Sequence, residues 1–255
     1  MDAGQTMDAG VTMDAGVTAD AGARSDGGAV TDAGTPDAGR GFCSLDGGLS
    51  AGQVTTYIYG GNGACTFSSG NRLVAAVAPS LAPSQCGACL RISPADGGGS
   101  GASGPPQTPV IVTIVDICPT CAQNQVDLST EALLALTGGS FADGRWNVLL
   151  ERVECPGDAG SPFVAVQSSS NPFFLSVVVE QTRRPVQSVS VRTGAQAPQP
   201  MIRQSFNAFT FSPTSALTPP LTFTITDDRG LTQTATVTAI APGNTPFTQF
   251  PTSCP

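Results

Sequence analysis

The sequence lacks two residue types altogether, lysine and histidine, so all 11 of its basic residues are arginine. Without histidine the chain cannot build an imidazole metal site, a Ser-His-Asp triad or a Cys-His dyad. It also lacks any apolar run that approaches the length of a membrane span, and it has no charged-then-apolar leader. We therefore expect no transmembrane segment, and an export signal, if there is one, must have been removed from this chain.

Positive charge is scarce. The formal net charge is −8, but residues 1–40 hold seven Asp and two Arg, which leaves a net charge of about −3 for the remainder. No basic stripe indicates nucleic-acid binding, and anionic polymers should be weakly repelled. We expect neither a nucleic-acid partner nor a bound cofactor.

Residues 1–40 are of low complexity and repeat Asp-Ala/Gly-Gly every six residues. This segment has no aromatic residues and almost no large aliphatic ones, so it cannot bury enough surface to offset the entropy cost of ordering. We interpret residues 1–40 as a flexible acidic spacer. A repeating calcium-binding turn is a less favoured alternative, because each hexad offers only one Asp.

The chain has eight cysteines, none of them in the spacer: Cys43, Cys65, Cys86, Cys89, Cys118, Cys121, Cys155 and Cys254. Two Cys-x-x-Cys pairs among them match the spacing of a four-thiolate zinc site. The four further cysteines and the loops rich in Gly and Pro instead favour disulfides, which form in oxidising compartments. We therefore expect a secreted or cell-surface protein without a metal ion.

A strand, a loop and a short helix form the most informative stretch. The β-branched run Val110–Val115 predicts a buried strand that ends at Asp116. Asp127 then stands at the start of a predicted helix, with Ser129 as its N-cap and Gly138 at its end. The two carboxylates can share one cleft. Alternatively, Asp116 caps a turn and Asp127 only helps to cap the helix.

The rest of the chain is predicted to be mainly β. In the first half, four strands, the short helix and a last strand through Trp146 follow one another without a repeated βαβ unit, which favours a compact β-barrel. Short alternating strands in the second half indicate a β-sandwich. The predicted division is a barrel at 41–156, a linker at 157–162 and a sandwich at 163–255.

Several motifs occur in an order that resembles the double-psi β-barrel of expansins and related microbial wall-loosening proteins. They are GNGAC at 61–65, CGACLRI at 86–92, VTIVDICPTC at 112–121, VDLS at 126–129 and DGRWNVLLERVEC at 143–155. The resemblance implies a six-stranded barrel with an open groove for a polysaccharide chain. It makes Asp127 the essential acidic residue, with Asp116 and Thr55 in the same groove.

The sequence departs from the expansin pattern at groove positions that are often aromatic. Cys118 stands at one of them and Thr56 at another, so Tyr57, Tyr59 and Trp146 are the candidates to replace those sugar contacts. Trp146 lies in an alternating strand, and we expect it in the core rather than on the surface.

The second half resembles the C-terminal expansin domain, an immunoglobulin-like sandwich that binds polysaccharide through surface aromatics. The matching residues are Phe173, Phe174 and Phe206. In a regular strand, adjacent Phe173 and Phe174 would point to opposite faces, so both face outward only if the chain twists or bulges there. The resemblance also implies the disulfides Cys65–Cys86 and Cys89–Cys155, and the pairs Cys118–Cys121 and Cys43–Cys254 then follow by elimination.

An inverting glycosidase needs an acid and a separate base about 6.5–9.5 Å apart. Asp127 suits the acid, but no carboxylate lies near Thr55, and we expect Asp116 to lie too close to act as the base. The prediction is a monomeric, non-hydrolytic protein that binds and loosens cellulose or a related β-glucan. The alternatives are a barrel glycosidase or a peptidoglycan lytic transglycosylase that uses Asp127 as acid, and a protease inhibitor or binding module on the same barrel.

Overall fold

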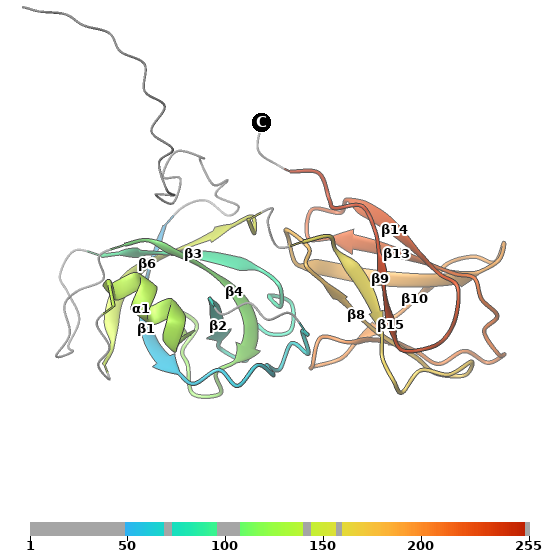
Figure 1. Ribbon diagram of the computed structural model, residues 1–255, viewed down its shortest axis with the longest axis horizontal. Coiled ribbons are helices and arrows are strands. Elements are labelled where there is room, and N and C mark those ends of the chain that lie inside the picture. The colour runs from blue at the N-terminus through green and yellow to red at the C-terminus, as the bar shows by residue number, and fades with distance from the viewer. Residues whose placement is uncertain (1–48, 69–72, 96–107, 140–143, 157–159, 253–255) are drawn as a thin grey trace, which may run out of the picture. The chain divides into compact units, whose positions relative to one another are not determined.

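A computed structural model of the chain describes residues 49–68, 73–95, 108–139, 144–156 and 160–252. Within these residues the chain forms a closed barrel and then two further sheets (Figure 1). The predicted spacer at 1–40 lies outside them. The predicted linker at 157–162 lies partly outside them and stays a prediction. No helix in the described ranges is long and apolar enough to cross a membrane.

The barrel contains six strands, as the resemblance implied, and their order is β1-β5-β2-β4-β3-β6. They are β1 (Ser50–Tyr57), β2 (Val74–Val77), β3 (Cys89–Pro94), β4 (Val110–Ile117), β5 (Gln125–Ser129) and β6 (Trp146–Val153). The β1–β5 and β2–β4 pairs are parallel and the other four pairs are antiparallel. The barrel is of the double-psi type, and closure leaves it without a free sheet edge.

Alternation along the strands fills the barrel. Val54, Val126 and Leu128 point inward and are fully or almost fully buried. Trp146 is 0% exposed and belongs to the same core cluster, so its predicted core position is confirmed. The outward positions of β1 and β5 are only half-buried and remain accessible to a ligand.

The predicted helix is present as α1 (Thr130–Thr137). The Ser129 hydroxyl accepts a hydrogen bond from the Ala132 backbone N–H at 3.3 Å, which makes it the N-cap. Gly138 ends the helix with φ at 69°, a left-handed conformation that glycine adopts without a steric penalty. Leu133 and Leu136 pack into the barrel core.

One element differs from the prediction. Residues 125–129, predicted to lead into the helix, form the strand β5, so Asp127 lies within a strand rather than at a helix start. The physical reason is that β5 hydrogen-bonds on both sides, in parallel to β1 and antiparallel to β2. Pairing on two edges outweighs the weak strand tendency of a five-residue segment that contains Asp.

The second half forms two sheets that share one apolar core, a β-sandwich as predicted. The first sheet has the order β10-β9-β13-β14, and the second has the order β11-β12-β8-β7-β15. The strands are β7 (Phe163–Val166), β8 (Leu175–Glu180), β9 (Val186–Thr193), β10 (Gln199–Pro200), β11 (Ile202–Arg203), β12 (Phe209–Phe211), β13 (Leu221–Asp227), β14 (Thr232–Val237) and β15 (Gly243–Pro246).

Candidate functional site

Asp127 lies on the outer side of the barrel, between strands from two different parts of the chain. It is in register with Thr55 on β1 and with Ala76 on β2. Residues in register on neighbouring strands project to the same side of a sheet. The half-buried side chains of Thr55 and Asp127 therefore share one surface, as the sequence predicted.

The side chains of these residues form a short hydrogen-bonded chain. The Thr55 hydroxyl donates to Oδ1 of Asp127, and Nε2 of Gln125 donates to the Thr55 hydroxyl at 3.3 Å. Gln125 was not predicted as a site residue. It lies two residues before Asp127 on β5, so the strand period that β5 follows would have placed both side chains on one face. These two hydrogen bonds fix the carboxylate of Asp127 in one orientation.

Asp116 and Asp127 lie on strands that are not adjacent in the barrel. Both residues are in register with Ala76, but on opposite sides of it, with Asp116 on β4 and Asp127 on β5. Two strand spacings correspond to about 10 Å between their Cα atoms. The expectation that Asp116 is too close to Asp127 to act as a base therefore does not follow from the topology.

The Asp116 carboxylate has another role. Its Oδ1 accepts hydrogen bonds from the backbone N–H groups of Ala64 and Ile117, each at 2.8 Å. The first of these bonds joins the loop after β1 to the end of β4. This role corresponds to the alternative in which Asp116 caps a turn, because the carboxylate accepts hydrogen bonds from backbone N–H groups.

Two tyrosines border the acidic surface. The rings of Tyr57 and Tyr59 meet edge to face, with centroids 6.2 Å apart. Burial, and then the negative charge of Asp116, raises the pKa of both phenols above the ordinary value, and Asp127 adds to the effect at Tyr57. Both phenols therefore stay protonated at neutral pH. The Tyr57 hydroxyl is buried and has no hydrogen-bond partner among the described residues.

A disulfide lies beneath this surface. Cys118 and Cys121 are bonded to each other, and their sulfur atoms lie within 4.8 Å of a carboxylate oxygen of Asp127. The Tyr57 ring packs against the same cluster. Sulfur atoms in a disulfide are not thiolates, so these residues do not form a zinc ligand set. The disulfide instead occupies the position where the family pattern often has an aromatic residue.

The other described cysteines are also paired as the resemblance implied, Cys65 with Cys86 and Cys89 with Cys155. The two Cys-x-x-Cys elements therefore do not combine into one four-thiolate site. The pair Cys43–Cys254 lies outside the described residues.

On the sandwich, the three matched phenylalanines lie in turns rather than in strands. Phe173 and Phe174 follow Asn171 in a tight turn closed by a bridge between Asn171 and Phe174. Phe173 is 60% exposed, whereas Phe174 is partly buried. Phe206 lies in the turn between β11 and β12 and is 48% exposed. The turn explains how Phe173 faces solvent without a strand bulge.

The sequence reasoning missed Ile202, which is 69% exposed on β11, four residues before Phe206. Its apolar side chain faces outward because β11 is an edge strand of only two residues. An isolated Ile-Arg pair carries no periodic pattern, so nothing in the sequence distinguished it from a buried position.

Phe206 lies next to the barrel. The Thr66 hydroxyl donates to the Phe206 carbonyl at 2.6 Å, and the Asn207 side chain donates to the Cys65 carbonyl at 3.3 Å. Ser68 donates through both its backbone N–H and its hydroxyl to Glu180 of β8, at 2.9 Å in each case. The loop that follows Tyr59 thus hydrogen-bonds to the sheet that carries the exposed aromatics.

No protein-family model matches the chain, and no curated protein matches it. Solved structures do match the chain. The crystal structure of apo-expansin from Clavibacter michiganensis has a TM-score of 0.67 and 24% identity, covering 80% of this chain and 99% of that chain. A point mutant of Clavibacter michiganensis expansin in complex with cellohexaose has a TM-score of 0.65 and 25% identity, covering 78% and 96% of the two chains.

A match that covers 80% of the chain is longer than either the barrel or the sandwich alone, so it includes both. It also covers almost the whole of the Clavibacter protein. In fold, the chain is therefore expansin-like, a six-stranded double-psi β-barrel followed by a β-sandwich.

Proposed function

We propose that the protein binds cellulose or a related β-glucan and loosens it without cleaving it. The surface formed by Thr55, Tyr57, Asp116 and Asp127 would hold a stretch of the glucan chain, and the sandwich aromatics would hold the protein on the polysaccharide. The observation that carries this proposal is that Asp127 is held in one orientation on a half-buried face that strands β1 and β5 share.

The chemistry of that face suits a sugar chain. Asp127 can accept hydrogen bonds from sugar hydroxyls, and Tyr57 can donate one or accept one. A hydrogen bond that involves a carboxylate is stronger than one between neutral groups, so Asp127 competes effectively with the bonds between neighbouring glucan chains. Replacing chain-to-chain hydrogen bonds by bonds to Asp127 is a means of loosening that needs no covalent step.

Hydrolysis is disfavoured by the state of the second carboxylate. An inverting glycosidase needs a base that holds a water molecule opposite the acid. Oδ1 of Asp116 already accepts two backbone N–H groups, which fix it to the loop after β1. We therefore assign Asp116 a role in positioning that loop rather than in activating water.

The exposed phenylalanines support polysaccharide binding by the sandwich. Flat aromatic rings bind the apolar faces of sugar rings, and Phe173 and Phe206 are 60% and 48% exposed. A similar expansin has been crystallised with cellohexaose. Phenylalanine has less area than tryptophan and no polar atom, so we expect weaker binding than a tryptophan surface would give.

Retention on microcrystalline cellulose tests the binding half of the proposal. The Phe173→Ala and Phe206→Ala variants should each bind about three- to tenfold more weakly in a pull-down measurement, because each loses one stacking contact. Leu231→Ala is the matched control, since Leu231 is 40% exposed but lies in the turn between β13 and β14, in the other sheet. Equal retention of all three variants would remove the aromatic surface from the proposal.

We also propose that the protein acts as a monomer outside the cell or at its surface. The three disulfides that the structure describes persist in oxidising compartments. Sedimentation analysis of the purified chain should give the mass of one 25.7 kDa chain.

A further inference from the structure

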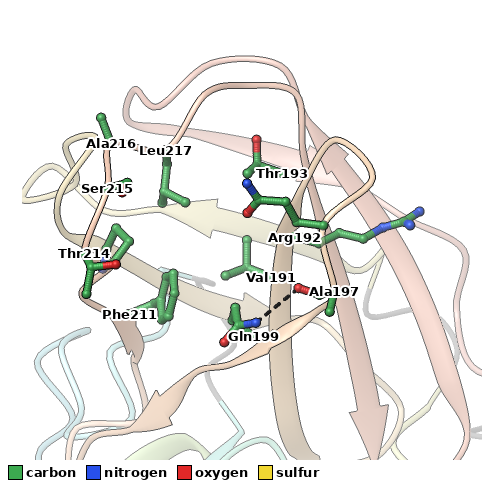
Figure 2. A pocket seen from close by; sticks show the side chains of 12 residues that line it. Val191, Arg192, Thr193, Ala197, Gln199, Phe211, Thr214, Ser215, Ala216 and Leu217 are labelled. Carbon is green, nitrogen blue, oxygen red and sulfur yellow. Dashed lines mark hydrogen bonds between the residues drawn. The ribbon is translucent and has the colours of Figure 1, made fainter.

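The sandwich contains a pocket that is separate from the barrel groove. The pocket has a volume of about 340 Å³ and lies between the loop at 193–199 and the loop at 211–217 (Figure 2). We call it the end pocket. Its volume is near the lower limit for small-molecule sites in proteins, so it suits one small ligand rather than a long segment of chain.

The end pocket is closed at its base. Val191 and Leu217 line it and also belong to the apolar core between the two sheets. The ring of Phe211, which packs against the same core, forms part of its wall (Figure 2). A ligand can therefore enter from the solvent side but cannot pass through. The pocket suits the end or a side branch of a polymer better than its middle.

Uncharged polar groups form the rim. Gln196, Gln199, Thr214 and Ser215 contribute amides and hydroxyls. Nε2 of Gln199 donates to the Ala197 carbonyl at 3.3 Å, which leaves its carbonyl oxygen free to accept a hydrogen bond. Gln196 has no side-chain hydrogen bond in the described part of the chain, so its amide can both donate and accept.

No carboxylate is among the described residues that line the end pocket, and Arg192 is the one charged residue there. Figure 2 shows the Arg192 guanidinium extended away from Phe211, Thr214 and Gln199. Its side chain follows the outward alternation of β9, opposite to the buried Val191. The interior therefore offers amides, hydroxyls and one aromatic ring, but no charge that would select an ion.

Amide groups around an aromatic wall match the chemistry of a neutral sugar ring, which carries hydroxyls at its edge and C–H groups on its faces. We propose that the end pocket binds the terminal residue of a neutral glycan, as a second site independent of the barrel groove. The backbone N–H of Leu217 donates to the Pro172 carbonyl at 2.8 Å, so the pocket wall is joined to the turn that carries Phe173. The pocket and the Phe173 turn are therefore neighbours on the sandwich, and in this proposal the terminal sugar contacts the pocket alone.

Two-dimensional ¹H–¹⁵N NMR of the full chain tests this proposal, with cellobiose, xylobiose and mannobiose as separate probes. At least one neutral disaccharide should shift the side-chain amide signals of Gln196 and Gln199, with a dissociation constant in the millimolar range. Those signals are identified by their loss in Gln196→Ala and Gln199→Ala. Absence of any shift at saturating concentrations of all three sugars would overturn the proposal.

Variants separate the end pocket from the aromatic surface. The double variant Gln196→Ala/Gln199→Ala should weaken binding of the disaccharide about tenfold, because it removes two hydrogen-bonding groups. Gln187→Ala is the matched control, as Gln187 is exposed on β9, the strand that pairs with β10, and does not line the pocket. Unchanged binding by the double variant, or loss of binding in Phe173→Ala, would place the sugar elsewhere and contradict the proposal.

A comparison of short and long ligands tests whether the end pocket binds the end of a glycan chain. Cellobiose and cellohexaose should bind the end pocket with affinities within about threefold of each other, because one terminal residue enters in both cases. Much tighter binding of cellohexaose at the Gln196 and Gln199 signals would indicate a bound chain segment instead. If the end-pocket proposal fails, retention of the protein on cellulose is unchanged. This outcome is therefore distinguishable from failure of the proposed function.

Discussion

At the scale of single residues, the Thr55 hydroxyl has the most specific role. It joins Gln125 to Asp127. A hydrogen bond to a charged group contributes about 1.5–3 kcal/mol. Thr55→Val, which keeps the shape of the side chain, should therefore lower wall-loosening activity about ten- to a hundredfold in a creep assay on isolated walls.

The neighbouring threonine provides the control for this variant. The Thr56 hydroxyl donates to the Leu128 carbonyl at 3.1 Å and does not contact Asp127. Thr56→Val should keep activity close to that of the wild type. Equal activity of both variants would mean that the orientation of Asp127 by Thr55 is not important.

Tyr57 gives a prediction about alkaline pH. Burial, and then nearby negative charge, raises the folded-state pKa of Tyr57 above its ordinary value of 10.0. Above pH 10 the unfolded chain loses the Tyr57 proton while the folded chain keeps it. The free energy of unfolding therefore falls as the pH rises above 10, and it is unaffected by this group below pH 10. Urea unfolding above pH 10 should show a smaller loss of stability for Tyr57→Phe than for the wild type. A parallel decline would contradict the assignment.

Trp146 provides a test of the barrel core. It is the only tryptophan and is fully buried. Trp146→Ala should reduce the free energy of unfolding by about 3–5 kcal/mol. In the wild-type protein, cellohexaose should leave tryptophan fluorescence almost unchanged, and a large spectral shift on binding would contradict the core position.

At this scale the sequence alone predicted one position and the family resemblance another. Alternation placed Trp146 in the core, and the resemblance to expansins implied that Asp127 and Thr55 share one surface. The separation of Asp116 from Asp127 depends on β2 lying between their strands. Non-consecutive strand order of this kind is not encoded in any local pattern, so the sequence alone could not place the strands of Asp116 and Asp127 relative to each other.

At the scale of elements, the loop after β1 depends on one glycine. A Cβ atom at Gly63 would lie 2.2 Å from the Val115 carbonyl oxygen, closer than any real contact. The loop has no room to move away, because Ala64 and Cys65 next to it hydrogen-bond to Asp116 and Val115. Gly63→Ala should destabilise the fold by about 1–3 kcal/mol in urea unfolding.

Gly60 in the same loop is the matched control, since a Cβ there would meet no atom within 4 Å. Gly60→Ala should leave the free energy of unfolding nearly unchanged. If both variants unfolded at the same urea concentration, the close approach at Gly63 would not be a constraint on the fold.

Local signals determined how well each element was predicted. Helix α1 carries its own cap residues, Ser129 and Gly138, and these were sufficient to locate it. Strand β5 has no comparable signal and forms because β1 and β2 supply partners that are distant in the sequence. The turn at Phe173 was likewise recognisable only as an irregularity near Asn171 and Pro172.

At the scale of the whole molecule, the proposed function divides between the barrel and the sandwich. The barrel presents an oriented carboxylate and two protonated phenols, and the sandwich presents exposed rings. Hydrogen bonds from Thr66, Ser68 and Asn207 join the two sheet systems beside Phe206. This division explains why binding and loosening should respond to different variants, with binding dependent on Phe173 and loosening dependent on Asp127.

The central claim is that the protein loosens polysaccharide without breaking its bonds. The most direct test incubates the wild-type protein and Asp127→Asn with microcrystalline cellulose and, separately, with peptidoglycan. Reducing ends and anhydro-sugar fragments are then assayed in the supernatants, and wall creep is measured in parallel. We predict Asp127-dependent creep, retention of both proteins on cellulose and no soluble fragments. Asp127-dependent release of fragments from either polymer would contradict the account and identify the barrel as a glycosidase or a lytic transglycosylase.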